Sequence, residues 1–192
     1  MLAMACYGQD GAIRVNYKGT RPTIVDFAEA YFGTFAVDHD GECPDEATWG
    51  FYKAWTRHRK GQPMREGETF VLDERNGYVL YESKSTYEQN TTTVRMEMCY
   101  WNESDGKHKL FAFSNWVFRN GLPYGGQYDV LLFWRYDNAT KKMTSCETPG
   151  FEVSYDNAYS LPRTGKDITV TYVQNGKKQQ KLLKWDGHKF SY

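Results

Sequence analysis

The feature that most constrains the fold is the stretch VRMEMCYWNESDGKHKLFAF, which occupies positions 94–113. Its alternating residues predict two strands joined at Asp105-Gly106, a dipeptide typical of tight hairpin turns. On one face the first strand carries Val94, Met96, Met98 and Tyr100, and on the other it carries Cys99 and Trp101 beside Arg95 and Glu97. An antiparallel strand that is half in water has one apolar and one polar face, so a covering layer is expected on each side of this hairpin.

Residues 127–136, QYDVLLFWRY, repeat the two-sided pattern. Three kinds of covering are compatible with it: helices from elsewhere in the chain, the far wall of a curled sheet, or a ligand or partner. Helices together with sheet curvature satisfy the pattern without any ligand, and they are the simplest expectation.

Two helices are predicted ahead of the strands. In residues 22–35, apolar side chains recur with the helical period after a Pro-Thr start. In residues 44–59, acidic residues come first and basic residues last, an order that complements the helix dipole. The second helix has a broad aromatic face formed by Trp49, Phe51, Tyr52 and Trp55.

From residue 69 onwards the sequence predicts an antiparallel meander. Asn76-Gly77 and Asn175-Gly176 mark hairpins, and Asp186-Gly187 turns the chain into a final strand. The predicted fold is α+β, with two N-terminal helices packed on a curved antiparallel meander of about eight strands, half-barrel-like or sandwich-like. Residues 1–20 are expected to form a signal remnant or N-terminal tail, and residues 21–192 a single domain.

Composition excludes some classes of protein. The 24 basic and 24 acidic residues give a net charge of zero, whereas a nucleic-acid-binding protein normally carries a basic excess. Aromatic residues make up 17% of the chain, which favours pleated sheet and also offers stacking surfaces. No apolar run is long enough to predict a membrane-spanning helix.

The first residues raise the question of export. Ala3-Met4-Ala5 resembles a signal-peptide cleavage site, although the apolar run before it is short, and a chance run of small residues is the alternative. Cys6 follows a sequence that resembles the lipid-attachment site of bacterial lipoproteins, with Ala3 where leucine is usual. The expectation is an exported protein of the periplasm or cell surface, with Cys6 as the candidate for a lipid anchor.

The other cysteines and the acidic residues predict no metal site and no cofactor. Cys43, Cys99 and Cys146 lack C-x-x-C spacing, and one disulfide among them or buried thiols are both open interpretations. The acidic stretch at residues 38–42 does not have the EF-hand spacing, so we interpret it as a solvated loop. The four histidines are interpreted as solvated residues of loops and helix ends: His39, His58, His108 and His188.

Common catalytic signatures, including G-x-S-x-G, H-E-x-x-H and nucleotide-binding glycine loops, do not occur in the sequence. Hydrolysis of a glycosidic bond would need two acids brought together in a cleft. The candidates on or near strands are Glu82, Glu88, Glu97, Asp129 and Glu152. Glu97 shares a strand face with Arg95, and a cross-strand ion pair is the simpler explanation. Whether the chain is an enzyme is left open, and a non-catalytic role is favoured.

Lysines are concentrated on the last predicted strands, at Lys177, Lys178, Lys181, Lys184 and Lys189. Lysines on an exposed edge strand prevent edge-to-edge aggregation, and this is the preferred interpretation. An anionic partner would use the same charges.

The segments LDERNGYVLYES, MEMCYWNESDGKHKLFAFS and LLKWDGHKF resemble segments of uncharacterised exported proteins of Bacteroidetes type. The resemblance covers residues 69–192 and rests on hairpin motifs: N-G-Y strands, Y-W followed by D-G, and a final W-x-G-x-x-F. It implies export and a β-rich fold, and it implies no activity.

Surplus aromatic area without catalytic signatures predicts a non-catalytic exported envelope protein that binds a glycan or a peptide. The candidate ligand-binding residues lie around the central hairpin and the loop at residues 121–127: Trp101, Trp116, Tyr124 and Tyr128. Two alternatives are an inhibitor or accessory subunit of an envelope complex, and a hydrolase that uses Glu97 with a second acid.

Overall fold

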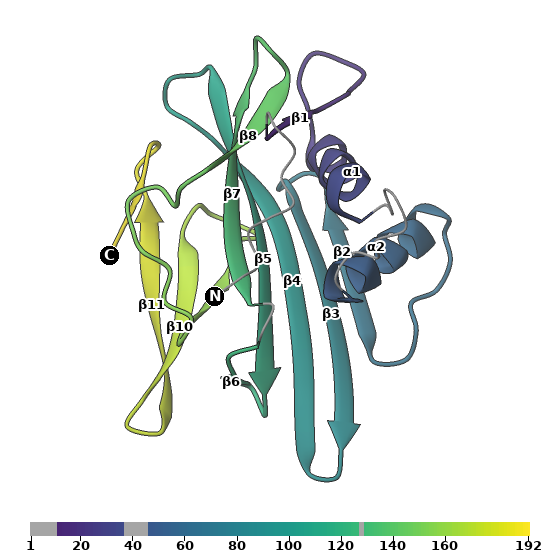
Figure 1. Cartoon of the computed structure of the whole chain (residues 1–192), viewed down its shortest axis with the longest axis vertical. Coiled ribbons are helices and arrows are strands. Elements are labelled where there is room, and N and C mark those ends of the chain that lie inside the picture. Colours follow the sequence, from purple (N-terminus) through teal and green to yellow (C-terminus); the bar gives the residue numbers. More distant parts are fainter. Residues whose placement is uncertain (1–10, 37–45, 127–128) are drawn as a thin grey trace.

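The computed structural model describes residues 11–36, 46–126 and 129–192 (Figure 1). The helices are α1 (Ile24–Phe35) and α2 (Glu46–Arg59), where the sequence predicts them. The strands are β1 (Ala12–Arg14), β2 (Glu68–Asp73), β3 (Tyr78–Tyr87), β4 (Asn90–Asn102), β5 (His108–Arg119), β6 (Leu122–Pro123), β7 (Val130–Asp137), β8 (Lys142–Cys146), β9 (Ala158–Ser160), β10 (Ile168–Gln174), β11 (Lys177–Trp185) and β12 (Phe190–Ser191). The predicted α+β class is confirmed.

The strands of the described residues form two antiparallel sheets. Sheet A has eight strands in the order β1-β8-β7-β5-β4-β3-β2, with β6 paired to β5, and it is not a closed barrel. Strands β2 to β5 are consecutive neighbours, so this part is the predicted meander. Sheet B contains the remaining four strands in the order β12-β11-β10-β9.

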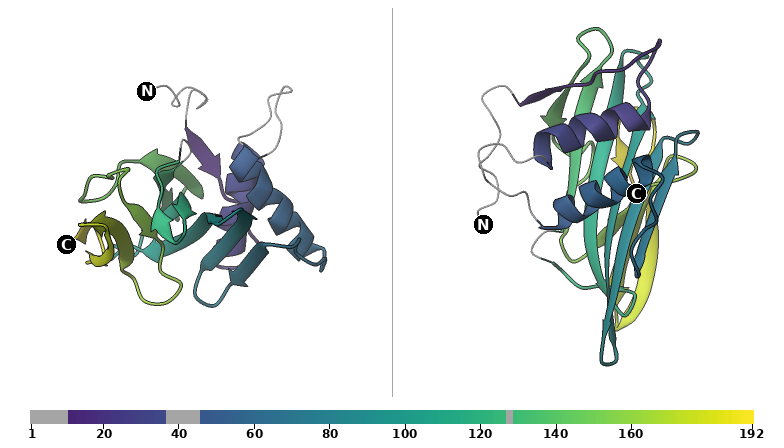
Figure 2. Two further views of the ribbon diagram at one scale, coloured as in Figure 1. Left: turned by 90° about the horizontal axis from the view of Figure 1, so that it is seen from below. Right: turned by 90° about the vertical axis from the view of Figure 1, so that its right-hand side faces the viewer.

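Sheet A is covered on both faces. Figure 2 shows α1 and α2 on one face and sheet B on the other. Met96 and Met98 of β4 belong to the core under the helices, whereas Cys99 and Trp101 of the same strand belong to the core against sheet B. The two-sided apolar pattern of residues 94–113 is therefore explained by two protein layers, without a ligand.

The core under the helices is built from aromatic rings. Asp26 closes a capping box at the start of α1, because its carboxylate accepts hydrogen bonds from the backbone N–H and the hydroxyl of Thr23 at 2.7 and 2.8 Å. One turn on, the ring of Phe27 is fully buried, and its centroid lies 5.2 Å from those of Tyr100 and Tyr136. Phe27 also stacks on Phe111 of β5. Through these rings α1 packs on three central strands of sheet A, β4, β5 and β7.

The core between the sheets has its own aromatic cluster. Trp101 of β4 contacts Trp185 of β11 and Phe190 of β12, with centroids 6.0 and 5.3 Å away. The indole N–H of Trp101 donates to the backbone carbonyl of Lys166 at 2.8 Å. This donor is satisfied although the ring is buried, as is usual for buried indole N–H groups.

The predicted boundary at residue 21 differs from the structure. Strand β1 lies within the predicted tail, and it pairs with β8 at the edge of sheet A. Ile13 and Val15 are buried in the core under the helices, so the folded part includes residues before position 21. A three-residue strand is too short to show a period in the sequence. The candidate residues Cys6, Cys43 and Tyr128, together with the acidic loop at 38–42, lie outside the described residues.

Cys99 and Cys146 are both free thiols. The register places them in one row across sheet A, because Cys99 is opposite Ala112, Ala112 is opposite Phe133, and Phe133 is opposite Cys146. Three strand spacings separate them by about 14 Å, whereas a disulfide needs Cα atoms within about 7 Å. A bond between these two cysteines is therefore excluded. None of the described helices is both long enough and apolar enough to cross a membrane.

Candidate functional site

Of the four predicted aromatic residues, the structure describes Trp101, Trp116 and Tyr124, and it does not bring these three together on the surface. Trp101 and Trp116 have only 4% and 1% of their surface exposed, because sheet B covers the face of sheet A on which they lie. The ring of Trp116 contacts Tyr159 of β9 at 5.3 Å. The surface role expected for these two indoles is corrected to a core role. Tyr124 is 50% exposed and lies under the guanidinium of Arg119 at 3.6 Å, as a single ring beside a cation.

A groove of about 330 Å³ lies between α1 and α2. It is lined by Glu29, Phe32, Gly33, Tyr52, Trp55, Thr56, Arg59 and Lys60, a set that we call the helix groove. Small-molecule sites usually occupy about 300–1,000 Å³, so the helix groove reaches the lower end of that range.

The floor of the helix groove is aromatic. Phe32 of α1 lies 5.6 Å, centroid to centroid, from both Tyr52 and Trp55 of α2. Phe32 and Trp55 are buried and Tyr52 is half-buried, so Tyr52 is the ring that a ligand reaches most easily. A Cβ atom at Gly33 would meet no other atom within 4 Å, which means that the glycine leaves space above the floor.

The rim of the helix groove is polar. The guanidinium of Arg59 lies 5.9 Å over the ring of Trp55, and its Nη2 is 3.5 Å from Oε1 of Glu29. Both partners of this ion pair are about half exposed. Exposed pairs of this kind contribute about 0–1 kcal/mol, so either group can turn towards a ligand at small cost. The hydroxyl of Thr56 and the ammonium of Lys60 add two further polar groups.

A second hollow, of about 190 Å³, lies at the end of β4 and is lined by Asn76, Asn102 and Lys166 beside Trp101 and Trp185. Its volume lies below the usual range of ligand pockets, about 300–1,000 Å³. We therefore interpret it as a hydrated recess.

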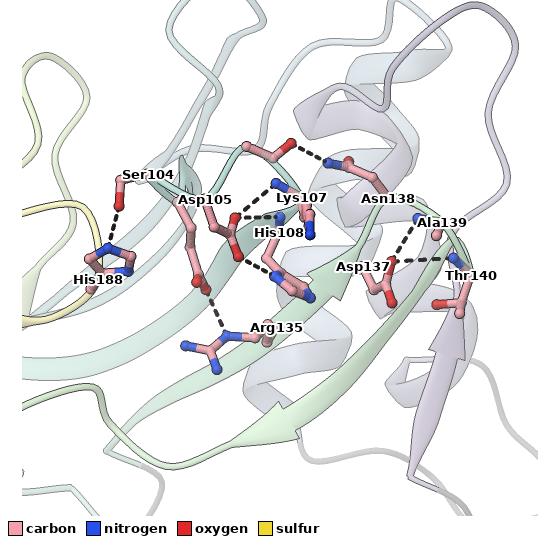
Figure 3. Close-up of polar contacts among 12 residues, drawn as sticks. Ser104, Asp105, Lys107, His108, Arg135, Asp137, Asn138, Ala139, Thr140 and His188 are labelled. Atoms are coloured by element: carbon pink, nitrogen blue, oxygen red, sulfur yellow. Dashed lines mark hydrogen bonds and ion pairs between the residues drawn. The ribbon is translucent and has the colours of Figure 1, made fainter.

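Figure 3 shows the polar cluster at the turn between β4 and β5. Ligand atoms of Glu103, Asp105 and His108 lie within 4.8 Å of one another, as in many metal sites. All three already have protein partners. Nε of Arg135 donates to Glu103 at 2.7 Å, and Asp105 accepts the backbone N–H groups of Lys107 and His108 and contacts Nδ1 of His108 at 2.5 Å. The hydrogen bonds from His108 and the backbone hold the pKa of Asp105 far below its ordinary value, and the cluster fastens the turn rather than offering vacant ligands.

The same figure shows a serine–histidine contact. The hydroxyl of Ser104 and Nε2 of His188 are hydrogen-bonded, and the N–H of Ser104 donates to the carbonyl of Gly187 at 3.0 Å. A catalytic triad also needs an acid on the second imidazole nitrogen. Asp186 instead accepts the backbone N–H groups of His188 and Lys189, at 2.7 and 2.8 Å. The contact therefore joins two turns, one from each sheet.

Glu97 lies inside the core between the sheets, with 2% of its surface exposed. Its carboxylate accepts the hydroxyl of Tyr78 at 2.5 Å and the N–H of Leu161 at 3.1 Å. Nε of Arg95 lies 3.9 Å from Glu97 and 3.2 Å from Glu82. Burial raises the pKa of Glu97 above its ordinary value. Glu97 lines neither of the two hollows. Its hydrogen bond to Leu161 links sheet A to the loop after β9.

Sequence reasoning missed the helix groove. The pattern marked Tyr52 and Trp55 as the aromatic face of a helix, and Phe32 as the core face of another. The sequence does contain a signal for the groove, namely polar residues one helical turn after the aromatic ones. Thr56 follows Tyr52 by four residues, and Arg59 follows Trp55 by four. Comparison with known proteins gave no match: no family model, no curated protein and no solved structure matches the chain.

Proposed function

We propose that the protein is a non-catalytic binding protein of the cell envelope that holds a glycan in the helix groove. The observation that carries the proposal is the combination of an aromatic floor and a polar rim in one hollow of about 330 Å³. A sugar ring has apolar C–H faces and a border of hydroxyl groups. Its faces match the half-buried ring of Tyr52, and its hydroxyls match the carboxylate, guanidinium and hydroxyl groups of the rim.

A peptide fits the helix groove less well than a sugar. Peptides are usually recognised as an added strand, as a helix in a long apolar groove, or as a polyproline helix on aromatic residues. The helix groove has no strand edge, and it is too small for a helix about 10 Å wide. Glycan binding would place the protein in the periplasm or at the cell surface, with Cys6 as the proposed anchor.

The hydrolase alternative has less support than binding. A glycosidase needs two acids on either side of a bound substrate. Glu97 and Glu82 are joined through Arg95 within the protein, and the only carboxylate that lines the helix groove is Glu29.

A glycan array followed by calorimetry tests the proposal. Tyr52→Ala and Arg59→Ala are each expected to weaken glycan binding about tenfold, which corresponds to about 1.4 kcal/mol. Tyr155→Ala is the matched control, because Tyr155 is exposed and does not line the groove. Thermal denaturation of each variant verifies that it is folded.

Two outcomes would contradict the proposal. One is an array on which no glycan binds the protein with a dissociation constant of a millimolar or less. The other is a bound glycan whose affinity is unchanged in both groove variants. Displacement of the glycan by a library-selected peptide with higher affinity would instead identify the groove as a peptide site.

A further inference from the structure

We infer that the exposed edge of β11 takes up an extended acidic segment of a partner protein as an additional strand of sheet B. On one side β11 pairs with β10 from Lys177 to Leu183. On the other side only Lys184 and Trp185 are paired, with β12. Within the described part of the chain, residues 177–183 therefore have an open edge, whose alternate N–H and C=O groups are available to another strand.

This edge lies on the far side of the molecule from the helix groove. Figure 1 places β10 and β11 at one side of sheet A and the helices at the other. The two surfaces share no residue, so the inference is independent of the proposed glycan site.

The charge of the edge selects an acidic occupant. β11 carries four exposed lysines, at positions 177, 178, 181 and 184. The hairpin at residues 168–185 contains no aspartate or glutamate, although the whole chain has a net charge of zero. A local excess of one sign speeds the encounter with a partner of the opposite sign and opposes partners of the same sign.

The register fixes which face each lysine occupies. Successive side chains of a strand alternate, so Lys177 and Lys181 lie on one face and Lys178 and Leu182 on the other. A docked strand is therefore expected to carry two acids four residues apart, about 13 Å along the strand, on the face of Lys177 and Lys181. On its other face an apolar residue would cover Leu182, which is 47% exposed.

Aromatic rings hold one of these lysines in place. The ammonium of Lys181 lies 3.7 Å from the ring centroid of Tyr192 and 5.5 Å from that of Tyr172. Cation–π contacts of this kind restrict the long side chain before binding, which lowers the entropy lost when an acid pairs with it.

Protection against aggregation, the interpretation preferred from sequence, is compatible with this inference. Like charges directly opposite each other on paired strands are destabilising. A second copy of β11 would place lysines near lysines, so the same charges that repel another copy of this chain attract an acidic strand. The occupant is accordingly a different protein.

A ten-residue peptide is the probe, with glutamates four residues apart on one face and a valine on the other. Two isomers of it carry N-methyl groups on alternate backbone nitrogens, either all odd or all even positions. The isomers have equal charge, but each lacks the N–H groups of one edge. Fluorescence anisotropy measures binding to the full chain, and hydrogen exchange locates the protected amides.

The expected result is that one isomer loses at least tenfold in affinity while the other binds like the parent peptide, and that amides of residues 177–183 become protected. Lys177→Glu with Lys181→Glu should weaken binding at least tenfold. The matched control is Lys18→Glu with Lys142→Glu, which makes the same charge change at exposed lysines that belong neither to β11 nor to the helix groove. Equal binding of both isomers would mean that the peptide is held by charge attraction alone, and it would overturn strand addition. Absence of binding, or protection away from β11, would overturn the inference as well.

Discussion

Replacement of Glu97 by glutamine is expected to remove a pH dependence of stability that the wild-type chain has. Burial between the sheets raises the pKa of Glu97 from its ordinary value of 4.5, and this effect exceeds the opposing effects of Arg95, Tyr78 and Leu161. The folded chain therefore holds this proton more tightly than the unfolded chain. Between pH 4.5 and the raised value the folded state binds more protons, so the free energy of unfolding falls as the pH rises through that window.

The size of the effect follows from the contacts of the carboxylate. Each unit of pKa difference corresponds to about 1.4 kcal/mol. Glutamine keeps the volume, its carbonyl can accept the N–H of Leu161, and its amide can donate to the hydroxyl oxygen of Tyr78. Glu97→Gln is therefore expected to lie within about 1 kcal/mol of the wild type at pH 5 and to become relatively more stable towards pH 8. Glu97→Ala leaves two buried donors without an acceptor and should lose about 2–4 kcal/mol.

Urea denaturation of the three proteins at half-unit steps from pH 4.5 to pH 8 measures these differences. The decisive quantity is the free energy of unfolding of the glutamine variant minus that of the wild type, which should increase with pH. A difference that stays constant would mean that Glu97 has the same pKa in both states. A difference that decreases would mean that its hydrogen bonds and Arg95 lower the pKa more than burial raises it, and the reasoning would be refuted.

Three further experiments test the packing and the strand register. Phe27→Ala should lose about 3–5 kcal/mol in urea denaturation, since it opens a cavity among buried rings, and a loss below about 1 kcal/mol would contradict the packing of α1 on sheet A. Gly150→Ala should lower the melting temperature more than Gly165→Ala. Both glycines have positive φ, but a Cβ at position 150 would lie 2.6 Å from a backbone oxygen of β12, whereas at position 165 it would meet nothing within 4 Å. Under non-reducing conditions Cys99 and Cys146 should both be alkylated after unfolding, and Cys146 should react faster than Cys99 in the native state. A disulfide-linked peptide that contains both cysteines, found by mass spectrometry, would refute the strand register.

Local patterns in the sequence were sufficient for the elements and for much of sheet A. The helical period of residues 22–35 and the Asn76-Gly77 turn act within one element or one hairpin, and α1 and the β2–β3 pair lie where they predict. The division into two sheets was not predictable in this way. Each hairpin pattern specifies its own two strands and says nothing about which third strand lies beside them, so β10 and β11 were expected to continue the meander.

The same limit explains the aromatic residues. A sheet that is covered on both faces needs apolar side chains at nearly every position, and the surplus aromatic area of this chain fills two cores. From sequence alone a tryptophan that faces a second sheet cannot be distinguished from one that faces water, and for this reason the sequence pattern predicts a surface position for Trp101 and Trp116. The helix groove depends on how α1 packs on α2, which no local period encodes.

The three-layer arrangement also determines how the two proposed surfaces relate to each other. A ligand in the helix groove contacts α1 and α2, and a strand added at β11 extends sheet B, with sheet A between them. Binding sites are coupled only if both ligands bias an element that has two arrangements. Sheet A is a poor candidate for such an element, because closely packed rings fix it on both faces and Glu97 bonds it to the loop after β9. The affinity of each surface is therefore expected to be independent of the other, so that one chain holds a glycan and a partner protein at the same time.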